Sequence, residues 1–439
     1  MSRALGHKTR FGTLEEQHIR RAAARVLRTQ FLLGELDGPS QVPQQKIDTA
    51  VVDSAEHRAL ALRAARESIV LLEHDGNTLP LAASARVAFI GPHVNTTQGF
   101  LSDYHGFRDV DDGPLQLARS RNVSVSSAMG CMLNSTTANP TELASAVSLA
   151  KRSEVAVVFV GLCGNNRLGP DGTPGCAGGT PVQETEGADR TSLELPGGQA
   201  QLLSAVLDTA TPVVLVLITG GPLAVDTASP SGHHAAAVLY APYGGQSGAT
   251  AIIDTLLGAS SPSGKSPVTW YGADFIKTRK SWDMDLRSGV GVTHLFYKGS
   301  PKWRFSHGLH YTSFTYRWAE TPHQGSLSAA SLVDAPSRWV PRVQVTNTGS
   351  RASGVVVLGF VNSSQPDFPQ QKLFDYQRME LTPGEATEVQ LNAQANTLAV
   401  VDEAGESWLT QAQFTVRIGD LLAPATAEFA VAGAPLRME

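Results

Sequence analysis

The sequence has 439 residues, of which 42% are hydrophobic and 17% charged, with 41 glycines, 25 prolines and a formal net charge of −5. This composition predicts a folded chain of two or three domains with many loops, and it does not favour nucleic acid or an anionic membrane as a partner. No apolar run approaches the roughly 20 residues that span a bilayer, and the first residues lack the apolar segment of a signal peptide.

Two helices are predicted near the N-terminus. Residues 14–31 carry apolar side chains at helical spacing, and the following stretch, FLLGELDGPSQVPQQ, has the composition of a linker. A second helix is predicted from about residue 54 to 72, with its apolar face in ALALRAARESIVLL.

Buried strands and helices are then predicted to alternate. Continuous apolar runs that end in Gly or Pro are typical of strands buried on both faces, and they occur at 86–92, 155–161, 212–220 and 235–245. Helical patterns separate them at 140–153, 197–210 and 246–258. This alternation predicts an α/β fold, an α/β sandwich domain with a mostly parallel sheet, over roughly 55–275.

The pattern changes after about residue 310. Short strand-like runs occur at 342–350, 354–362, 376–393 and 413–420, and Pro383-Gly384 is interpreted as a hairpin-like turn within the third. Several short strands within about 120 residues predict a β-sandwich.

The cysteines and the glycosylation signals bear on the compartment. Cys163 and Cys176 flank one loop, so they can either close it as a disulfide or remain, with Cys131, as unpaired thiols. Four Asn-x-Ser/Thr signals, at Asn95, Asn122, Asn134 and Asn362, lean weakly toward secretion.

The sharpest candidates for chemistry are Glu184 and Glu186, in the segment VQETEGADR. Their loop leaves the strand predicted at 155–161, and functional residues gather at the carboxyl ends of such strands. One interpretation is that a glutamate here donates a proton. The other is that Asp189 and Arg190 form a buried ion pair and the glutamates are solvated or cap a helix. Two glutamates on one loop cannot face each other across a glycosidic bond, so a second carboxylate must come from elsewhere.

Other polar clusters are weaker. The stretch 91–106 offers His93, Asp103, Tyr104 and His105, which either line a sugar pocket or form a polar loop. The stretch ITGGPLAVD (218–226) is not a Gly-x-Gly-x-x-Gly segment and lacks the lysine of a phosphate loop, so nucleotide binding is not expected there. No Gly-x-Ser-x-Gly elbow is present, and no Cys/His spacing is typical of zinc. We therefore expect neither a metal nor an organic cofactor.

Seven blocks occur in a fixed order: AARESIVLLEHDGNTLPL, VAFIGPHVN, EVAVVFVGL, ETEGADRTSLELPGGQAQLL, VVLVLITGGPLAVD, LYAPYGGQSGATAIIDTLLGASSPSGKSPVTWY and RFSHGLHYTSFTY. Together they closely resemble glycoside hydrolase family 3, the β-glucosidase and β-xylosidase family. A further stretch, DMDLRSGVGVTHLFYKGSP, leans toward the β-xylosidase branch.

This resemblance implies a domain plan. Residues 1–50 would be the last helix of the family's N-terminal (β/α)8 barrel and a linker, and 51–275 its α/β sandwich domain. Residues 276–315 would connect this domain to a fibronectin type III-like domain at 316–439, where KLFDYQRMELTPGEATEVQL carries the likeness.

The resemblance also implies a reaction. In the family a barrel aspartate is the nucleophile and a glutamate on a sandwich loop, before an Asp-Arg pair in many members, is the acid/base of a retaining hydrolysis. Glu186, three residues before Asp189, is the better match, and Glu184 is the second choice because the Glu-x-Glu pattern leaves the register open. The implied partner is a β-linked xylo- or gluco-oligosaccharide or glycoside.

The chain departs from the family in lacking most of the barrel, and with it the nucleophile. We expect it to be a fragment or inactive alone, and to need a (β/α)8 barrel for a complete site. Extracellular location is expected from the family. A non-catalytic carbohydrate-binding or interaction module is the alternative, and the choice between xylose and glucose stays open.

Overall fold

The computed structural model describes residues 16–38, 41–102, 104–106, 112–133, 137–164, 184, 186, 190–320, 325–334 and 340–438. The chain divides into two units, Met1–Leu60 and Ala61–Glu439. In the first unit the predicted helix is present as α2 (Glu16–Leu32), followed by the single turns η1 (Pro43–Lys46) and η2 (Thr49–Val51). No residue of α2 is buried, and its apolar residues Val26, Phe31 and Leu32 are exposed.

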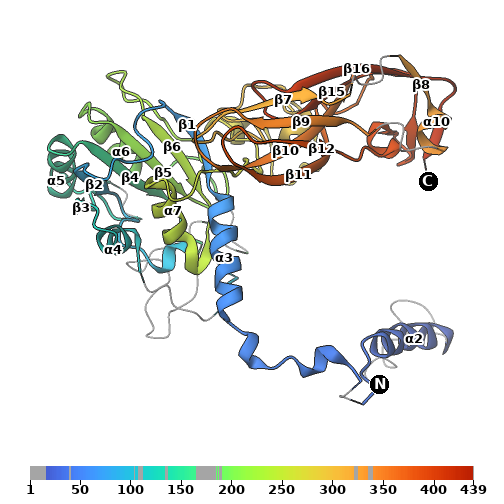
Figure 1. The fold of residues 1–439 in the computed structure, drawn as a ribbon, viewed down its shortest axis with the longest axis horizontal. Coiled ribbons are helices and arrows are strands. Elements are labelled where there is room, and N and C mark those ends of the chain that lie inside the picture. The colour runs from blue at the N-terminus through green and yellow to red at the C-terminus, as the bar shows by residue number, and fades with distance from the viewer. Residues whose placement is uncertain are drawn as a thin grey trace. The chain divides into compact units, whose positions relative to one another are not determined.

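A six-stranded sheet forms the centre of the first half of the second unit (Figure 1). Its order is β1-β6-β5-β4-β2-β3, and every neighbouring pair is parallel except β1 with β6. The prediction of an α/β fold with a mostly parallel sheet is confirmed. The strands are β1 (Val70–His74), β2 (Val87–Ile90), β3 (Val125–Ala128), β4 (Val155–Gly161), β5 (Val213–Ile218) and β6 (Ala237–Ala241).

Helices cover both faces of this sheet. Side chains of α5 (Pro140–Lys151) and α6 (Gln199–Leu207) share one apolar core with the sheet, and those of α4 (Pro114–Ser120) and α7 (Gly248–Leu256) share the other. Since both faces are covered, the central strands are apolar throughout and almost wholly buried. Asn139 begins α5, because its side chain accepts hydrogen bonds from the N–H groups of Thr141 and Glu142.

The prediction of a helix over 54–72 is wrong at its C-terminal end. Helix α3 (Ala55–Ser68) stops before Val70, where the chain enters β1. Val70 and Leu71 are fully buried and lie opposite Tyr240 and Leu239 of β6, so the edge position decides their structure. A short apolar run that follows a helical pattern does not reveal such a change by periodicity alone.

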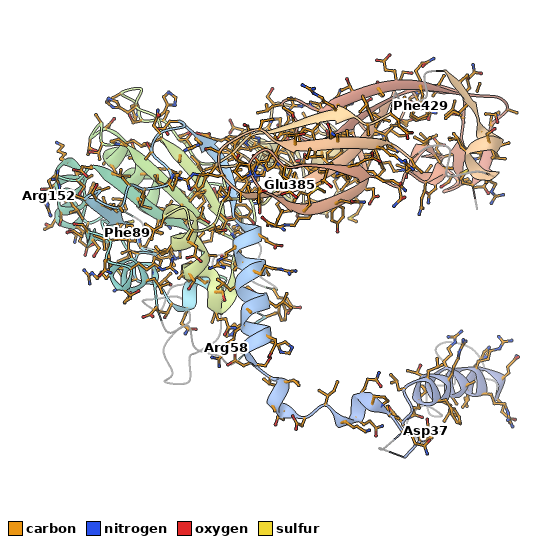
Figure 2. All side chains as sticks on the ribbon, viewed as in Figure 1. Asp37, Arg58, Phe89, Arg152, Glu385 and Phe429 are labelled. Atoms are coloured by element: carbon orange, nitrogen blue, oxygen red, sulfur yellow. The ribbon has the colours of Figure 1, made fainter. Side chains whose placement is uncertain are left out.

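The second half of this unit is a β-sandwich, as predicted. One sheet has the order β12-β9-β7, the other has the order β11-β10-β15-β16-β8, and their side chains share one core. Figure 2 labels Phe89, in a core of the α/β domain, and Phe429, in the core of the sandwich. The strands are β7 (Phe314–Trp318), β8 (Ser326–Ser328), β9 (Arg342–Asn347), β10 (Ser353–Ser363), β11 (Lys372–Leu381), β12 (Ala386–Gln390), β15 (Ala412–Ile418) and β16 (Ala425–Ala432).

Smaller elements complete the unit. A three-stranded sheet has the order β13-β14-β17, and its strands are β13 (Val400–Val401), β14 (Ser407–Leu409) and β17 (Leu436–Met438). The other described helices are short: η3 (Gln98–Phe100), η4 (Gly245–Ser247), η6 (Ala395–Leu398), α8 (Phe275–Thr278), α9 (Thr293–Phe296) and α10 (Ala329–Asp334).

The turn at Pro383-Gly384 is not a hairpin. It joins β11 to β12, but β11 pairs with β10 and β12 pairs with β9 in the other sheet. Gly384 has a φ of +77°, which glycine adopts without steric cost, so the chain can turn sharply here and cross between the sheets.

Candidate active site

Glu184 is held at the carboxyl edge of the parallel sheet. Its Oε1 accepts hydrogen bonds from the Gly220 N–H at 2.7 Å and from the Tyr243 hydroxyl at 2.5 Å. Gly220 follows β5 by two residues, and Tyr243 follows β6 by two residues. Two neighbouring strands therefore place donors against one carboxylate, whose side chain is only 19% exposed.

Small residues make this close approach possible. A Cβ atom at Gly220 would lie 3.1 Å from Glu184 Oε1 and 3.2 Å from the Tyr243 ring. A Cβ at Gly164, just beyond β4, would lie 3.1 Å from the Glu184 carbonyl oxygen and 3.1 Å from the same ring. Larger residues at these two positions would push the loop away from the strand ends.

Arg190 completes the cluster. Its Nε lies 3.7 Å from Glu184 Oε2, and Nη1 and Nη2 donate to the Pro222 carbonyl at 3.3 and 3.2 Å. The predicted partner of Arg190 was Asp189, which lies outside the described residues. Among the residues that the structure describes, the carboxylate that Arg190 meets is Glu184.

The cluster changes the acidity of two tyrosines. Burial, reinforced by the Glu184 carboxylate, raises the pKa of Tyr243 far above its ordinary value. The same two causes raise the pKa of Tyr240 to about 12. Both hydroxyls therefore stay protonated near neutral pH, and Tyr243 acts as a permanent donor to Glu184.

Glu186, two residues further on, differs from Glu184. It is exposed and lies in a turn. No hydrogen bond or ion pair holds its carboxylate among the residues that the structure describes, so it is free to meet a ligand. The structure therefore separates the two glutamates into one that is anchored and one that is accessible.

The polar side chains that the structure describes in the stretch 91–106 differ in exposure. His93 is only 2% exposed, and burial lowers its pKa to about 4, so its ring is neutral and enclosed. Tyr104 is exposed, and Asp103 lies outside the described residues. The suggestion that these side chains line a sugar pocket together is therefore wrong for His93.

Cys163 is disulfide-bonded, whereas Cys131 is a free, buried thiol. Cys176 lies outside the described residues. Within the described ranges, no group of three or more His, Cys, Asp or Glu side chains is placed to hold a metal ion. In the same ranges no helix is long and apolar enough to cross a membrane.

Tyr243 is the residue of this cluster that sequence reasoning missed. It precedes the glycines of YGGQSG, within the sixth block of the family resemblance, but its side chain was not singled out from the sequence. Its link to Glu184 spans 59 positions and depends on β5 and β6 being neighbours. The tyrosine at a predicted strand end was the available signal.

Replacing Tyr243 by phenylalanine should lower the free energy of unfolding by about 2 kcal/mol, because a hydrogen bond to a charged group is lost. Tyr376→Phe is the matched control, since Tyr376 is exposed and its hydroxyl has no hydrogen bond among the described residues. Urea denaturation of both variants measures the difference. Equal stability of the two variants would show that the Tyr243–Glu184 bond does not hold the loop.

Comparisons with known proteins identify the family of the chain. Residues 69–311 match the glycosyl hydrolase family 3 C-terminal domain. The chain belongs to glycosyl hydrolase family 3. Residues 356–421 match a fibronectin type III-like domain, which accounts for the sandwich.

The relatives of this family 3 chain are xylosidases and glucosidases. The probable exo-1,4-β-xylosidase bxlB of Aspergillus fumigatus is 32% identical over 98% of the chain and 55% of its own length. β-D-Xylosidase 1 of Arabidopsis thaliana is 30% identical over 93% of the chain and 54% of its own length. The chain thus spans about half the length of the curated relatives it matches.

Solved structures give the same result. A family 3 exo-β-xylosidase, XlnD, solved with a xylobiose aziridine activity-based probe, superposes with a TM-score of 0.84 at 26% identity, over 97% of this chain and 55% of that one. A β-glucosidase from Erythrobacter marinus superposes with a TM-score of 0.72 at 27% identity, over 98% and 57%.

Proposed function

We propose that this family 3 chain supplies the acid/base side of an active site that hydrolyses β-linked xylosides or glucosides with retention of configuration. The nucleophile would come from a (β/α)8 barrel. The relatives' names support the substrate class, and their greater length supports the need for a further domain. The exposed apolar residues of α2 also support it, because an amphipathic helix is stabilised by burying that face.

The observation that carries the proposal is the anchoring of Glu184 at the ends of β5 and β6. Ligands of open parallel sheets bind outside the carboxyl ends of the strands. With Glu184 fixed there by Gly220 and Tyr243, Glu186 lies only two residues from this edge and is accessible. This arrangement suits a carboxyl group that meets a substrate at the edge of the sheet.

The contacts favour Glu186 over Glu184 as the acid/base. A general acid must reach the oxygen that it protonates. Both carboxylate oxygens of Glu184 already face protein groups, since Oε1 accepts hydrogen bonds from Gly220 and Tyr243 and Arg190 lies beside Oε2, whereas Glu186 is exposed. We therefore assign Glu184 to holding the loop and Glu186 to proton transfer.

The proposed reaction has two steps. In the first, the barrel carboxylate attacks the anomeric carbon while Glu186 protonates the departing glycosidic oxygen. In the second, the ionised Glu186 takes a proton from water, which attacks the glycosyl–enzyme bond and releases the sugar. The two carboxyl groups would need to lie about 5 Å apart for this route.

The proposal is tested by measuring release of 4-nitrophenol from its β-xyloside and β-glucoside. We expect the 439-residue chain alone to show no turnover. A version preceded by the barrel half of a relative such as bxlB should release the phenol. Turnover by the chain alone would contradict the need for a barrel nucleophile. Sugar binding without turnover in the joined protein would favour a carbohydrate-binding module instead.

A further inference from the structure

A pocket of about 360 Å³ lies between the connecting segment and the β-sandwich. Three cationic side chains line it, Lys298, Arg304 and Arg417, together with the amides of Gln370 and Gln371. None of its lining residues is an aspartate or glutamate. Its electrostatic character is therefore positive, with neutral hydrogen-bonding groups beside the charges.

These cations have no carboxylate partners among the residues that the structure describes. The arginines that line a larger pocket, of about 620 Å³, differ in this respect; Arg66 and Arg378 are among them. There Arg66 pairs with Asp254 at 2.6 Å, and Arg378 pairs with Glu67 at 3.2 Å and Glu380 at 2.9 Å. The guanidinium groups of the larger pocket are already occupied, whereas those of Arg304 and Arg417 are available to a ligand.

The pocket is built on a rigid support. The His294 ring stacks on Phe305 with centroids 4.0 Å apart, and Phe305 meets Phe360 edge-on at 6.1 Å. Phe360 lies opposite Arg417 in the β10–β15 register, so the same packing fixes the strand that carries Arg417. The Gln370 N–H donates to the Leu295 carbonyl at 2.8 Å, which fixes the other wall.

One lining residue has a strained backbone. Thr293 has a φ of +61°, an unfavourable conformation for a β-branched residue. Its N–H donates to the Tyr271 hydroxyl at 2.7 Å, which holds it there. Strain that the surroundings maintain is found preferentially at ligand sites.

We propose that this pocket binds a sugar that carries a carboxylate, that is, a uronic acid or a saccharide ending in one. Planar guanidinium groups match a carboxylate in two parallel hydrogen bonds, and amide and hydroxyl side chains match sugar hydroxyls. The volume lies within the range of small-molecule sites and exceeds that of an inorganic anion. This site is separate from the Glu184 cluster, and its occupation does not depend on hydrolysis.

The test is a calorimetric titration of the full 439-residue chain with D-glucuronate, with D-glucose, acetate and inorganic phosphate as comparison probes. Glucuronate should bind at least about tenfold more tightly than any of the other three. Arg304→Gln and Arg417→Gln should each weaken its binding by about tenfold. Arg317→Gln is the matched control, because Arg317 is an exposed β7 arginine that does not line the pocket.

Three results would overturn the proposal. Equal binding of glucose would show that the charge is not recognised, and equal binding of acetate or phosphate would show a general anion site. Unchanged binding in both Arg304→Gln and Arg417→Gln would place the ligand elsewhere. Circular dichroism checks that each variant is folded, which we expect because both arginines are exposed.

Discussion

Glu186→Ala, in a version of the protein that includes the barrel, should lower kcat/KM for a substrate with a poor leaving group by about 10²–10⁴-fold. The loss should be much smaller for a dinitrophenyl glycoside, because its leaving group departs without protonation. Added azide should partly restore turnover, since a small anion can replace the water that Glu186 activates. Steady-state rates over a series of aryl xylosides measure this dependence.

Two other glutamates make the test specific to Glu186. Glu184→Ala should lower the rates by a similar factor for every leaving group, because it disturbs the loop through Gly220 and Tyr243 rather than proton transfer. Glu142→Ala, at an exposed position in the first turn of α5, should leave the rates unchanged. If Glu184→Ala shows the leaving-group dependence and Glu186→Ala does not, the two roles are exchanged.

The sequence predicted the central strands well because burial on both faces leaves a continuous apolar run. The run predicted at 155–161 is β4, from Val155 to Gly161, and the neighbouring strands β5 and β6 lie within their predicted ranges. Edge strands carry less information. Strand β3, from Val125 to Ala128, has two exposed serines, and nothing in its short polar pattern separates it from a loop.

The site was predictable only in part, for a related reason. The sequence shows a glutamate in a long loop after a predicted strand, and it offers Glu184 and Glu186 as two candidates for the acid/base. What distinguishes them is contact with Gly220 and Tyr243, which are 36 and 59 positions from Glu184. Those contacts follow from the order of strands in the sheet, which local patterns do not encode.

A partly buried ion pair joins the α/β domain to the sandwich. Lys265, after α7, donates to Asp420 Oδ2 at 3.3 Å and to the Gly308 carbonyl at 2.6 Å. The side chains of Lys265 and Asp420 are 8% and 26% exposed. Burial acts to raise the pKa of Asp420, but the Lys265 ammonium and the Leu422 N–H outweigh it, and the pKa lies below its ordinary value. Asp420 is therefore ionised and balances the charge of Lys265.

Asp420→Asn should lower the free energy of unfolding by about 3 kcal/mol, because it leaves the buried ammonium without a counter-charge. Adding Lys265→Met should recover most of the loss, since an apolar side chain of similar length removes the unpaired charge. Asp274→Asn breaks an exposed pair with Lys277 and should leave the urea midpoint nearly unchanged. If Asp420→Asn behaves like Asp274→Asn, water screens the Lys265–Asp420 pair, and the two domains are joined by their other contacts.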